Sequence, residues 1–250
     1  MTPMIISRID DVAVLTLERG RVNALNEPFV DSLTGAFEDL ERDDGVRAVV
    51  LTGRGRFFSF GFDIPEFLGY EKDDFMRYLR KFTDLYKRMF IFPKPLLAAV
   101  NGHAVAGGCM LALTCDERYM VPGKAKISLN EIQFGSTVFA GSVEMLRFCA
   151  GRKNAQIFLF SGDMFTAEEA ARLGVVDRVV PEEKLLDESV LRASELGKKQ
   201  APAFRNIKSL LRRPVADEMS RREGESLKEF IDIWYSDNTR EFLRHITIRD

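Results

Sequence analysis

Histidine and cysteine are scarce in this chain, and their scarcity narrows the chemistry that it can support. There are only two histidines, His103 and His245, and they lie far apart in the sequence. A zinc site or a Ser-His-Asp triad is therefore poorly supported, and we expect no metal. The three cysteines, Cys109, Cys115 and Cys149, have no CxxC spacing and lie in apolar runs. This pattern is typical of reduced, buried cysteines in a cytosolic protein.

Long apolar runs, phosphate-binding motifs and an excess of charge are also missing. No apolar run approaches the ~18 residues that a membrane span needs, and the N-terminus shows no basic region followed by an apolar one, so we expect no secretory signal. The 36 Lys and Arg residues nearly balance the 38 Asp and Glu residues, which implies no attraction to nucleic acid or to a membrane surface. Neither GxGxxG nor GxxxxGK(S/T) occurs, which disfavours a Rossmann or P-loop site. These absences favour a cytoplasmic protein with neither nucleic acid nor membrane as a partner.

Strand-like and helix-like segments alternate along most of the chain, which predicts an α/β fold. The 250 residues suffice for one large domain with an appended subdomain. A hairpin is expected over 5–18, and Thr166 with Glu169 forms a capping box before a short helix. From residue 182 onward the pattern is helical throughout. The other expected strands are 46–52, 95–100, 119–121, 126–129 and 175–180, and the expected helices are 29–40, 73–90, 109–115, 142–149, 154–160, 168–173, 182–199, 203–212, 215–235 and 238–246.

Two glycine-rich turns follow expected strands. Phe57–Asp63 comes after the strand at 46–52, and Ala106–Gly108 leads into the apolar helix at 109–115. Glycine lets the backbone approach a ligand closely, and N–H groups in a first helical turn have no partner within the helix. Two such turns can aim two N–H groups at one carbonyl oxygen, as in an oxyanion hole for thioester or ester chemistry. An ordinary Gly-rich strand–helix turn is the alternative interpretation.

Five motifs occur in a fixed order between Val12 and Leu186: FSFGFD, AAVNGHAVAGGC, TCD, LNEIQFG and FTAEEAARLGVVDRVVPEEKL. In this order they resemble the crotonase superfamily, the enoyl-CoA hydratase/isomerase fold. The resemblance implies a spiral of ββα turns over residues 1–195 and a C-terminal helical region, 196–250, that builds a homotrimer or a hexamer. It also implies an acyl-CoA substrate, with coenzyme A as part of the substrate and no separate cofactor.

The resemblance further assigns roles to individual positions. The thioester carbonyl is expected between the backbone N–H groups of Phe62 and Gly107. The family commonly has a small residue at the first of these positions, so the Phe62 ring is expected to reshape the acyl pocket. A solvated side chain is the alternative for Arg21, and a helix cap is the alternative for Asp63. The residues expected to bind the coenzyme A moiety or the acyl chain are Arg21, Val22, Ala24, Ser59, Phe60, Asp63, Ile64, Met110 and Phe139.

The acidic residues carry most of the functional argument. Hydratases of this family use two glutamates, and the matching positions here are Met110 and Glu131. A thioether neither donates nor accepts protons usefully, so the pair needed to add water is incomplete. Moving a double bond from the 3,4 to the 2,3 position needs only one base, which removes a proton from C2 and returns it to C4. Burial in an apolar pocket should raise the pKa of Glu131 toward the working range of such a shuttle.

Three further stretches resemble one subfamily. LALTCD, LNE and the tail ESLKEFIDIWYSDNTREFL are similar to segments of the mitochondrial-type Δ3,Δ2-enoyl-CoA isomerases of fatty acid metabolism, which also have an apolar residue at the first acid position. The sequence therefore favours an isomerase with Glu131 as its only base. One alternative is another crotonase reaction: hydration (a lyase reaction), decarboxylation or thioester hydrolysis. The other is a non-catalytic member that binds acyl-CoA or serves as an assembly subunit.

Several of these side chains also have ordinary structural interpretations. Position alone makes Glu131 a surface or capping glutamate, and the resemblance reverses that expectation. Glu144 is expected on a solvated helix face, although it is the one candidate for a second acid. Asp116 is expected to satisfy backbone N–H groups at a helix end. Phe134, Phe139, Phe158 and Phe160 are expected in the core, with Phe139 also placed to shorten or bend the acyl pocket.

Overall fold

A six-stranded sheet forms the centre of the structure, a computed structural model that describes residues 3–246. The first two strands pair as an antiparallel hairpin, as predicted, and all the other neighbours in the sheet are parallel. In spatial order the strands are β1 (Met4–Ile9), β2 (Val12–Leu17), β3 (Ala48–Gly53), β5 (Leu96–Val100), β7 (Glu117–Met120) and β9 (Arg178–Val179).

A second, smaller parallel sheet runs beside the first. Its strands are β4 (Phe57–Ser59), β6 (His103–Val105) and β8 (Ile127–Ser128). Each follows a strand of the large sheet, so the chain repeats one unit three times: a strand in each sheet, then helical structure. This is the spiral of ββα turns that the resemblance implied, and it brings the carboxyl ends of β4 and β6 together.

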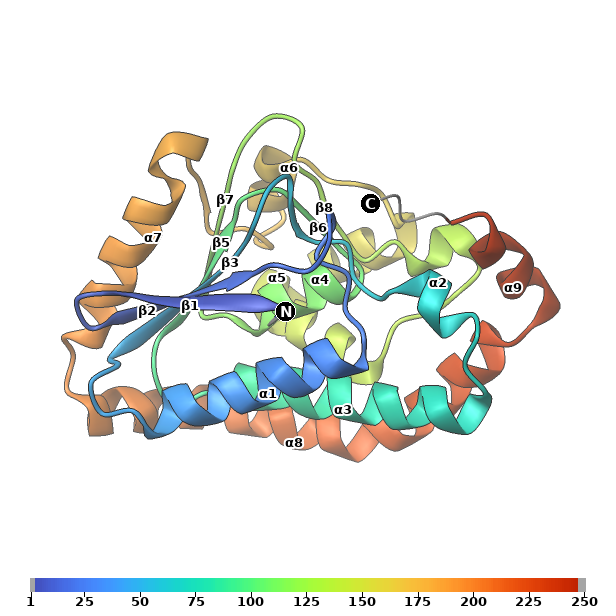
Figure 1. Ribbon diagram of the computed structural model, residues 1–250, viewed down its shortest axis with the longest axis horizontal. Helices are drawn as coiled ribbons and strands as arrows, with labels where there is room; N and C mark the ends of the chain where they lie inside the picture. The colour runs from blue at the N-terminus through green and yellow to red at the C-terminus, as the bar shows by residue number, and fades with distance from the viewer. Residues whose placement is uncertain (1–2, 247–250) are drawn as a thin grey trace.

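Helices cover the large sheet and extend beyond it (Figure 1). The orange α7 packs on β2, β3 and β5, while α1, α3 and α8 lie side by side on the other side of the molecule. At the centre, α4 is buried along its whole length, as expected of a helix that is apolar all round. The helices are α1 (Glu27–Arg42), α2 (Ile64–Phe67), α3 (Lys72–Phe90), α4 (Gly107–Thr114), the 3₁₀ turn η1 (Glu131–Phe134), α5 (Ala140–Ser161), α6 (Ala167–Arg172), α7 (Glu182–Gly197), α8 (Ala201–Trp234) and α9 (Asp237–Arg244).

Two asparagines hold the turns at the ends of the strands. Asn101 accepts a hydrogen bond from the Gly53 N–H (2.9 Å) and donates one to the Gly55 carbonyl (2.9 Å). Asn23, which has a positive φ of 51°, donates to the carbonyl of Phe57 (2.9 Å). These bonds satisfy backbone groups that no strand partner reaches, and they fix the turns relative to one another.

Several local predictions were wrong for reasons of tertiary packing. The two helices expected at 203–212 and 215–235 are one helix, α8, which continues through Pro214 because residues on both sides of the proline pack against α3 and α5. The strand expected at 175–180 shrinks to β9, and β6, α2 and η1 were missed because each is only three or four residues long. Phe160 is 70% exposed rather than part of the core.

The helical end of the chain packs on its own core. Phe230 and Trp234 are buried, whereas Ile233 and Phe242 are exposed. The boundary predicted at residue 195 falls near the end of α7. Within residues 3–246, no helix is both long and apolar enough to cross a membrane.

Candidate active site

A cavity of about 400 Å³ opens where the carboxyl ends of β4 and β6 face α8 and α9. Its wall is mostly apolar and aromatic, as in sites for acyl groups and other small molecules. Seven of the residues predicted for the site lie in this wall: Phe60, Phe62, Ile64, Gly107, Met110, Glu131 and Phe139. The rest of the wall consists of Val105, Ala106, Asn130, Phe134, Ser136, Phe230, Trp234, His245 and Ile246.

Two backbone N–H groups of the cavity wall are available to a ligand. Neither the Phe62 N–H nor the Gly107 N–H makes a hydrogen bond within the described part of the chain. Gly107 begins α4, so its N–H also lies at the positive end of the helix dipole. Buried N–H groups are seldom left unpaired in proteins, so this pair is suited to receive an oxygen that becomes anionic.

The backbone around this pair is packed tightly and is strained at one residue. Ala106 has φ 49° and ψ −119°, a conformation that costs on the order of 1–3 kcal/mol for a residue with a side chain. Gly61 has φ +87°, and a Cβ there would lie 2.9 Å from the Gly107 nitrogen. A Cβ on Gly108 would lie 2.1 Å from the Ser59 carbonyl oxygen. Only glycine at these two positions lets the two turns approach one another this closely.

The Phe62 side chain belongs to an aromatic cluster. Its ring meets Tyr78 and Phe82 edge-on, with centroids 5.1 and 5.0 Å away, and lies 6.1 Å from Phe139. A Cβ on Gly107 would touch the same ring at 3.1 Å. The large residue is therefore accommodated by packing that leaves its N–H on the cavity side, and its ring forms part of the wall.

Glu131 is the first residue of η1 and is 5% exposed. Its Oε2 has no hydrogen-bond partner among the described residues, and no ion pair to its carboxylate occurs there. Loss of hydration on burial raises the pKa of Glu131 to about 8. A carboxyl group with a pKa near neutrality, in an apolar cavity beside free N–H groups, is equipped to take and return a proton.

Met110 lies one turn into α4 and presents a thioether to the same cavity. Glu131 is the only carboxylate among the described residues of the wall. Glu144, the other candidate acid, is buried instead of solvated and is paired with Arg147 (3.0 Å) and Arg222. It is not part of the wall, because those two arginines hold its carboxylate elsewhere.

Four of the residues predicted to bind substrate hold the turn Phe57–Asp63 in place. Ser59 is fully buried, and its hydroxyl donates to the Asn23 carbonyl (2.8 Å) and accepts from the Gly61 N–H (3.2 Å), so its side chain supports the turn, and its contact with coenzyme A stays a prediction. Asp63 is the N-cap of α2 and also pairs with Arg19 (2.8 Å). Val22 and Ala24 are buried and contribute backbone carbonyls, to the Phe60 N–H and to Arg19 respectively.

Arg21 lies in a separate groove. This hollow of about 360 Å³ is lined by Glu18, Gly20, Arg21, Arg54, Gly55 and Arg56, from the loops that follow β2 and β3. Arg54 pairs with Glu18. Arg54 and Arg56 were not predicted, although the GRGR sequence directly after a buried strand was a usable signal.

Phe230 and Trp234 of α8, and His245 and Ile246 after α9, were also missed as wall residues. They lie about a hundred residues after Glu131, in and after helices whose apolar residues had several possible partners. No local motif marks them, so only the packed chain reveals them.

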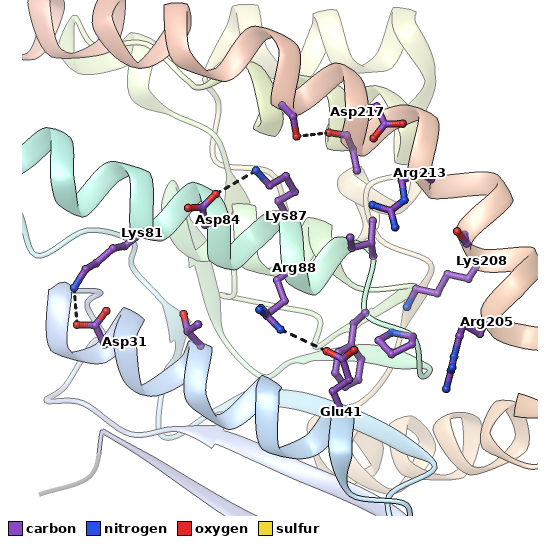
Figure 2. Close-up of a pocket in the computed structure, with 17 residues that line it drawn as sticks. Asp31, Glu41, Lys81, Asp84, Lys87, Arg88, Arg205, Lys208, Arg213 and Asp217 are labelled. Atoms are coloured by element: carbon purple, nitrogen blue, oxygen red, sulfur yellow. Dashed lines mark hydrogen bonds and ion pairs between the residues drawn. The ribbon is translucent and has the colours of Figure 1, made fainter. Parts of the chain in front are cut away.

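A larger hollow of about 800 Å³ lies between α1, α3 and α8, and its lining is charged (Figure 2). Figure 2 shows its charges in ion pairs: Lys81 with Asp31 (2.8 Å) and Arg88 with Glu41 (3.5 Å) between α3 and α1, and Lys87 with Asp84 (3.1 Å) along α3 itself. None of the described side chains lining it has a buried polar atom without a partner. The chemistry therefore concentrates in the smaller cavity. No group of three or more potential metal ligands occurs within residues 3–246.

Comparison with known proteins agrees with this geometry. The family model described as enoyl-CoA hydratase/isomerase matches residues 8–241. A 2,3-dehydroadipyl-CoA hydratase of Escherichia coli is 35% identical over 85% of this chain and 82% of its own length. The human mitochondrial enoyl-CoA delta isomerase 1 is 29% identical over 93% of this chain and 78% of its own length.

Solved structures lead to the same family. The crystal structure of human mitochondrial delta3-delta2-enoyl-CoA isomerase superimposes with a TM-score of 0.91 at 28% identity, over 97% of this chain and 95% of that one. Fold, cavity and sequence therefore agree, and the chain is an enzyme of the enoyl-CoA hydratase/isomerase family, the crotonase superfamily.

Proposed function

We propose that this enzyme shifts the double bond of a 3-enoyl-CoA to the 2,3 position, with Glu131 as its only acid–base group. The observation that carries this proposal is one carboxylate without an ion pair among the described residues, in the same cavity wall as two N–H groups without a partner there, with Met110 at the position where a second acid would lie. The human isomerases to which the chain is similar support the same choice.

The reaction needs one proton carrier and one site for negative charge. The Glu131 carboxylate removes a proton from C2. The C–H electron pair forms a double bond between C1 and C2, and the carbonyl π pair moves onto the thioester oxygen, while the C3=C4 bond is kept. The N–H groups of Phe62 and Gly107 stabilise this dienolate oxygen. Glu131 then returns the proton to C4: the carbonyl re-forms, the C1=C2 pair becomes the C2=C3 bond, and the C3=C4 pair takes the proton, which regenerates the carboxylate. Its raised pKa reduces the energy gap for both transfers.

The coenzyme A moiety would extend from the cavity toward the Arg21 groove. Arg21 and Arg56 make no ion pair within the described residues, so their guanidinium groups are available for phosphates. The apolar cavity wall would hold the acyl chain and exclude water from the dienolate. Coenzyme A enters as part of the substrate, and the proposed steps require no further cofactor.

Hydration of a 2-enoyl-CoA is the second candidate. Ser136 and Asn130 line the same cavity, and each has a buried oxygen without a partner among the described residues. Such oxygens can hold a water molecule near the acyl chain. Several relatives, including the Escherichia coli protein, carry hydratase names.

An absorbance assay separates the two candidates. Wild type and Glu131→Gln are given a trans-3-enoyl-CoA and, separately, a trans-2-enoyl-CoA. We expect conversion of the first substrate to the conjugated thioester, no hydration of the second, and loss of the conversion in the variant. Faster hydration than isomerisation by the wild type would overturn the proposal in favour of the hydratase.

We also infer that the protein assembles as a homotrimer or as a hexamer made of two such trimers. Ile207, Leu210 and Leu211 of α8 are exposed apolar side chains, which support burial against a second copy. Analytical ultracentrifugation tests this inference, and a monomer at micromolar concentration would contradict it.

A further inference from the structure

The C-terminal helix α9 lies at the ends of two short helices that flank the cavity. α2 starts two residues after Phe62, which supplies one N–H group of the proposed oxyanion site. η1 starts with Glu131 itself. Figure 1 shows α2 and α9 on the same side of the molecule, and α9 also packs against η1. One helix therefore contacts both the turn that carries Glu131 and the segment that follows Phe62.

Thr239 holds the end of η1. Its side chain is buried, at 1% exposure, and its Oγ1 donates to the Gly135 carbonyl at 2.6 Å. Gly135 is the left-handed C-cap of η1, with φ 70°. The Ser236 Oγ lies 3.1 Å from the Thr239 Oγ1, and the Ser236 hydroxyl also donates to the Ile233 carbonyl at 2.7 Å. Because η1 is a single 3₁₀ turn, its geometry depends on such outside contacts.

Arg240, the next residue, holds the end of α2. Its Nη2 donates to the Leu68 carbonyl at 2.9 Å, and Leu68 is the C-cap of α2. The guanidinium lies over the Tyr235 ring, 5.1 Å from its centroid. The Tyr235 hydroxyl donates to the Tyr70 carbonyl at 2.6 Å, two residues further along. The loop after α2 is thus attached to the α8–α9 junction at two points.

We propose that α9 is a positioning clip, in which Thr239 fixes the helix that carries the base and Arg240 fixes the helix that follows the oxyanion turn. The carbonyl at each helix end has no further partner within its own helix, and the clip gives it one. Neighbouring residues of a single helix therefore set the distance between the proton carrier and the charged oxygen. A misplacement of about 1 Å between such groups can cost about 10²-fold in rate. This inference rests on the proposed function for its kinetic readout only.

Substitutions at Thr239 test the clip. Thr239→Val keeps the shape and removes the hydroxyl, and we expect kcat to fall about 10- to 100-fold while KM changes by less than about threefold. Thr239→Ser restores the hydroxyl and should return kcat to within about threefold of the wild type. Thr34→Val is the matched control, because Thr34 makes a similar hydroxyl–carbonyl bond to Val30 within the remote helix α1 and should keep its activity.

A readout independent of turnover separates positioning from simple stabilisation. We expect Thr239→Val to admit water beside η1 and so to move the pKa of the Glu131 carboxyl, measured by infrared difference spectroscopy against Glu131→Gln, from about 8 toward its ordinary value of 4.5. Arg240→Gln should lower kcat several-fold while the pKa of Glu131 stays near 8, because it acts on the oxyanion half. If Thr239→Val does not fold, Arg240→Gln and Thr239→Ser still test the clip through kcat.

The two possible failures are distinguishable. A wild type that does not isomerise 3-enoyl-CoA overturns the proposed function, and the Glu131 pKa still reports on the clip. Variants that lose thermal stability, yet keep kcat and the Glu131 pKa, overturn the clip while the proposed function stands.

Discussion

Two acids near the centre of this protein have opposite environments. Asp116 accepts hydrogen bonds from Lys208 (2.7 Å) and from the Leu96 N–H (2.8 Å), and Arg212 lies 3.1 Å from its other oxygen. The carboxylate of Glu131 makes no ion pair in the described part of the chain, and one of its oxygens has no partner there. From the sequence, Asp116 was expected to satisfy backbone N–H groups, and Glu131 was expected to act on a ligand. In the structure Asp116 accepts from a backbone N–H and two cations surround it, whereas Glu131 faces the cavity without an ion pair among the described residues.

Asp116 is half-buried and Glu131 is buried, and the comparison shows what pairing does to a carboxylate. Lys208 and Arg212 come from α8 and are themselves buried, so their contacts with Asp116 join α8 to the end of α4. Such a network of charges and hydrogen bonds binds the elements together. Glu131 lacks this compensation, so its charge is disfavoured and its proton becomes exchangeable near neutral pH. One acid contributes to the fold, and the other is available for chemistry.

The strongest test of the comparison is loss of the unpaired acid. Glu131→Gln keeps the side-chain size and removes the proton carrier, so we expect isomerisation to fall by about 10²–10⁴-fold. Steady-state rates on a 3-enoyl-CoA check this, with circular dichroism to show that the fold is intact. Near wild-type activity in the variant would exclude Glu131 as the base.

Loss of the paired acid should act on stability instead. Asp116→Asn leaves two buried cations without their carboxylate, which should cost about 3–5 kcal/mol of the free energy of unfolding. Burial already lowers the pKa of Lys208, so this residue can lose its proton and bring the cost toward the lower limit. Urea unfolding measures the change, while activity per folded molecule should stay within about twofold. An unchanged unfolding midpoint would remove the contrast between the two acids.

The pH dependence of the rate should report Glu131. Since the base must be ionised, kcat/KM should rise about tenfold per pH unit below the pKa and level off above about 8. A pH series from 5.5 to about 9 on the wild type measures this limb. A rise of kcat/KM centred near pH 4.5, the ordinary pKa of a glutamate, would show that the carboxylate is hydrated in solution.

The smallest expected effect is on stability as a function of pH. The pKa of Glu131 is about 8 in the folded state and 4.5 when unperturbed, so between these values the folded state holds a proton that the unfolded state has released. Its stabilising contribution is complete below pH 4.5 and is lost as the pH rises toward 8. Glu131→Gln lacks this loss and should be more stable than the wild type at pH 7 by on the order of 3 kcal/mol. If the difference in unfolding free energy between Glu131→Gln and the wild type were the same at pH 5 and at pH 7, this prediction would be wrong.

Local sequence determined much of the architecture. The Asp10–Asp11 hairpin, the amphipathic pattern of α3 and the capping box of Thr166 and Glu169 all lead to the elements observed. These features depend on contacts between residues close in the chain, for which periodicity and capping chemistry are sufficient. The glycines of the two turns and the lone Glu131 were also visible, because glycine and acid positions are marked by residue type.

Tertiary structure decided the rest. Whether Pro214 ends a helix, whether Glu144 is solvated, and which aromatic rings close the cavity depend on partners that lie tens to hundreds of residues away. The same holds for Thr239 and Arg240, whose carbonyl partners belong to helices too short to predict. The sequence therefore determined which residues could do chemistry, while only the folded chain determined which acid was paired and which remained free, because burial and pairing are properties of long-range packing.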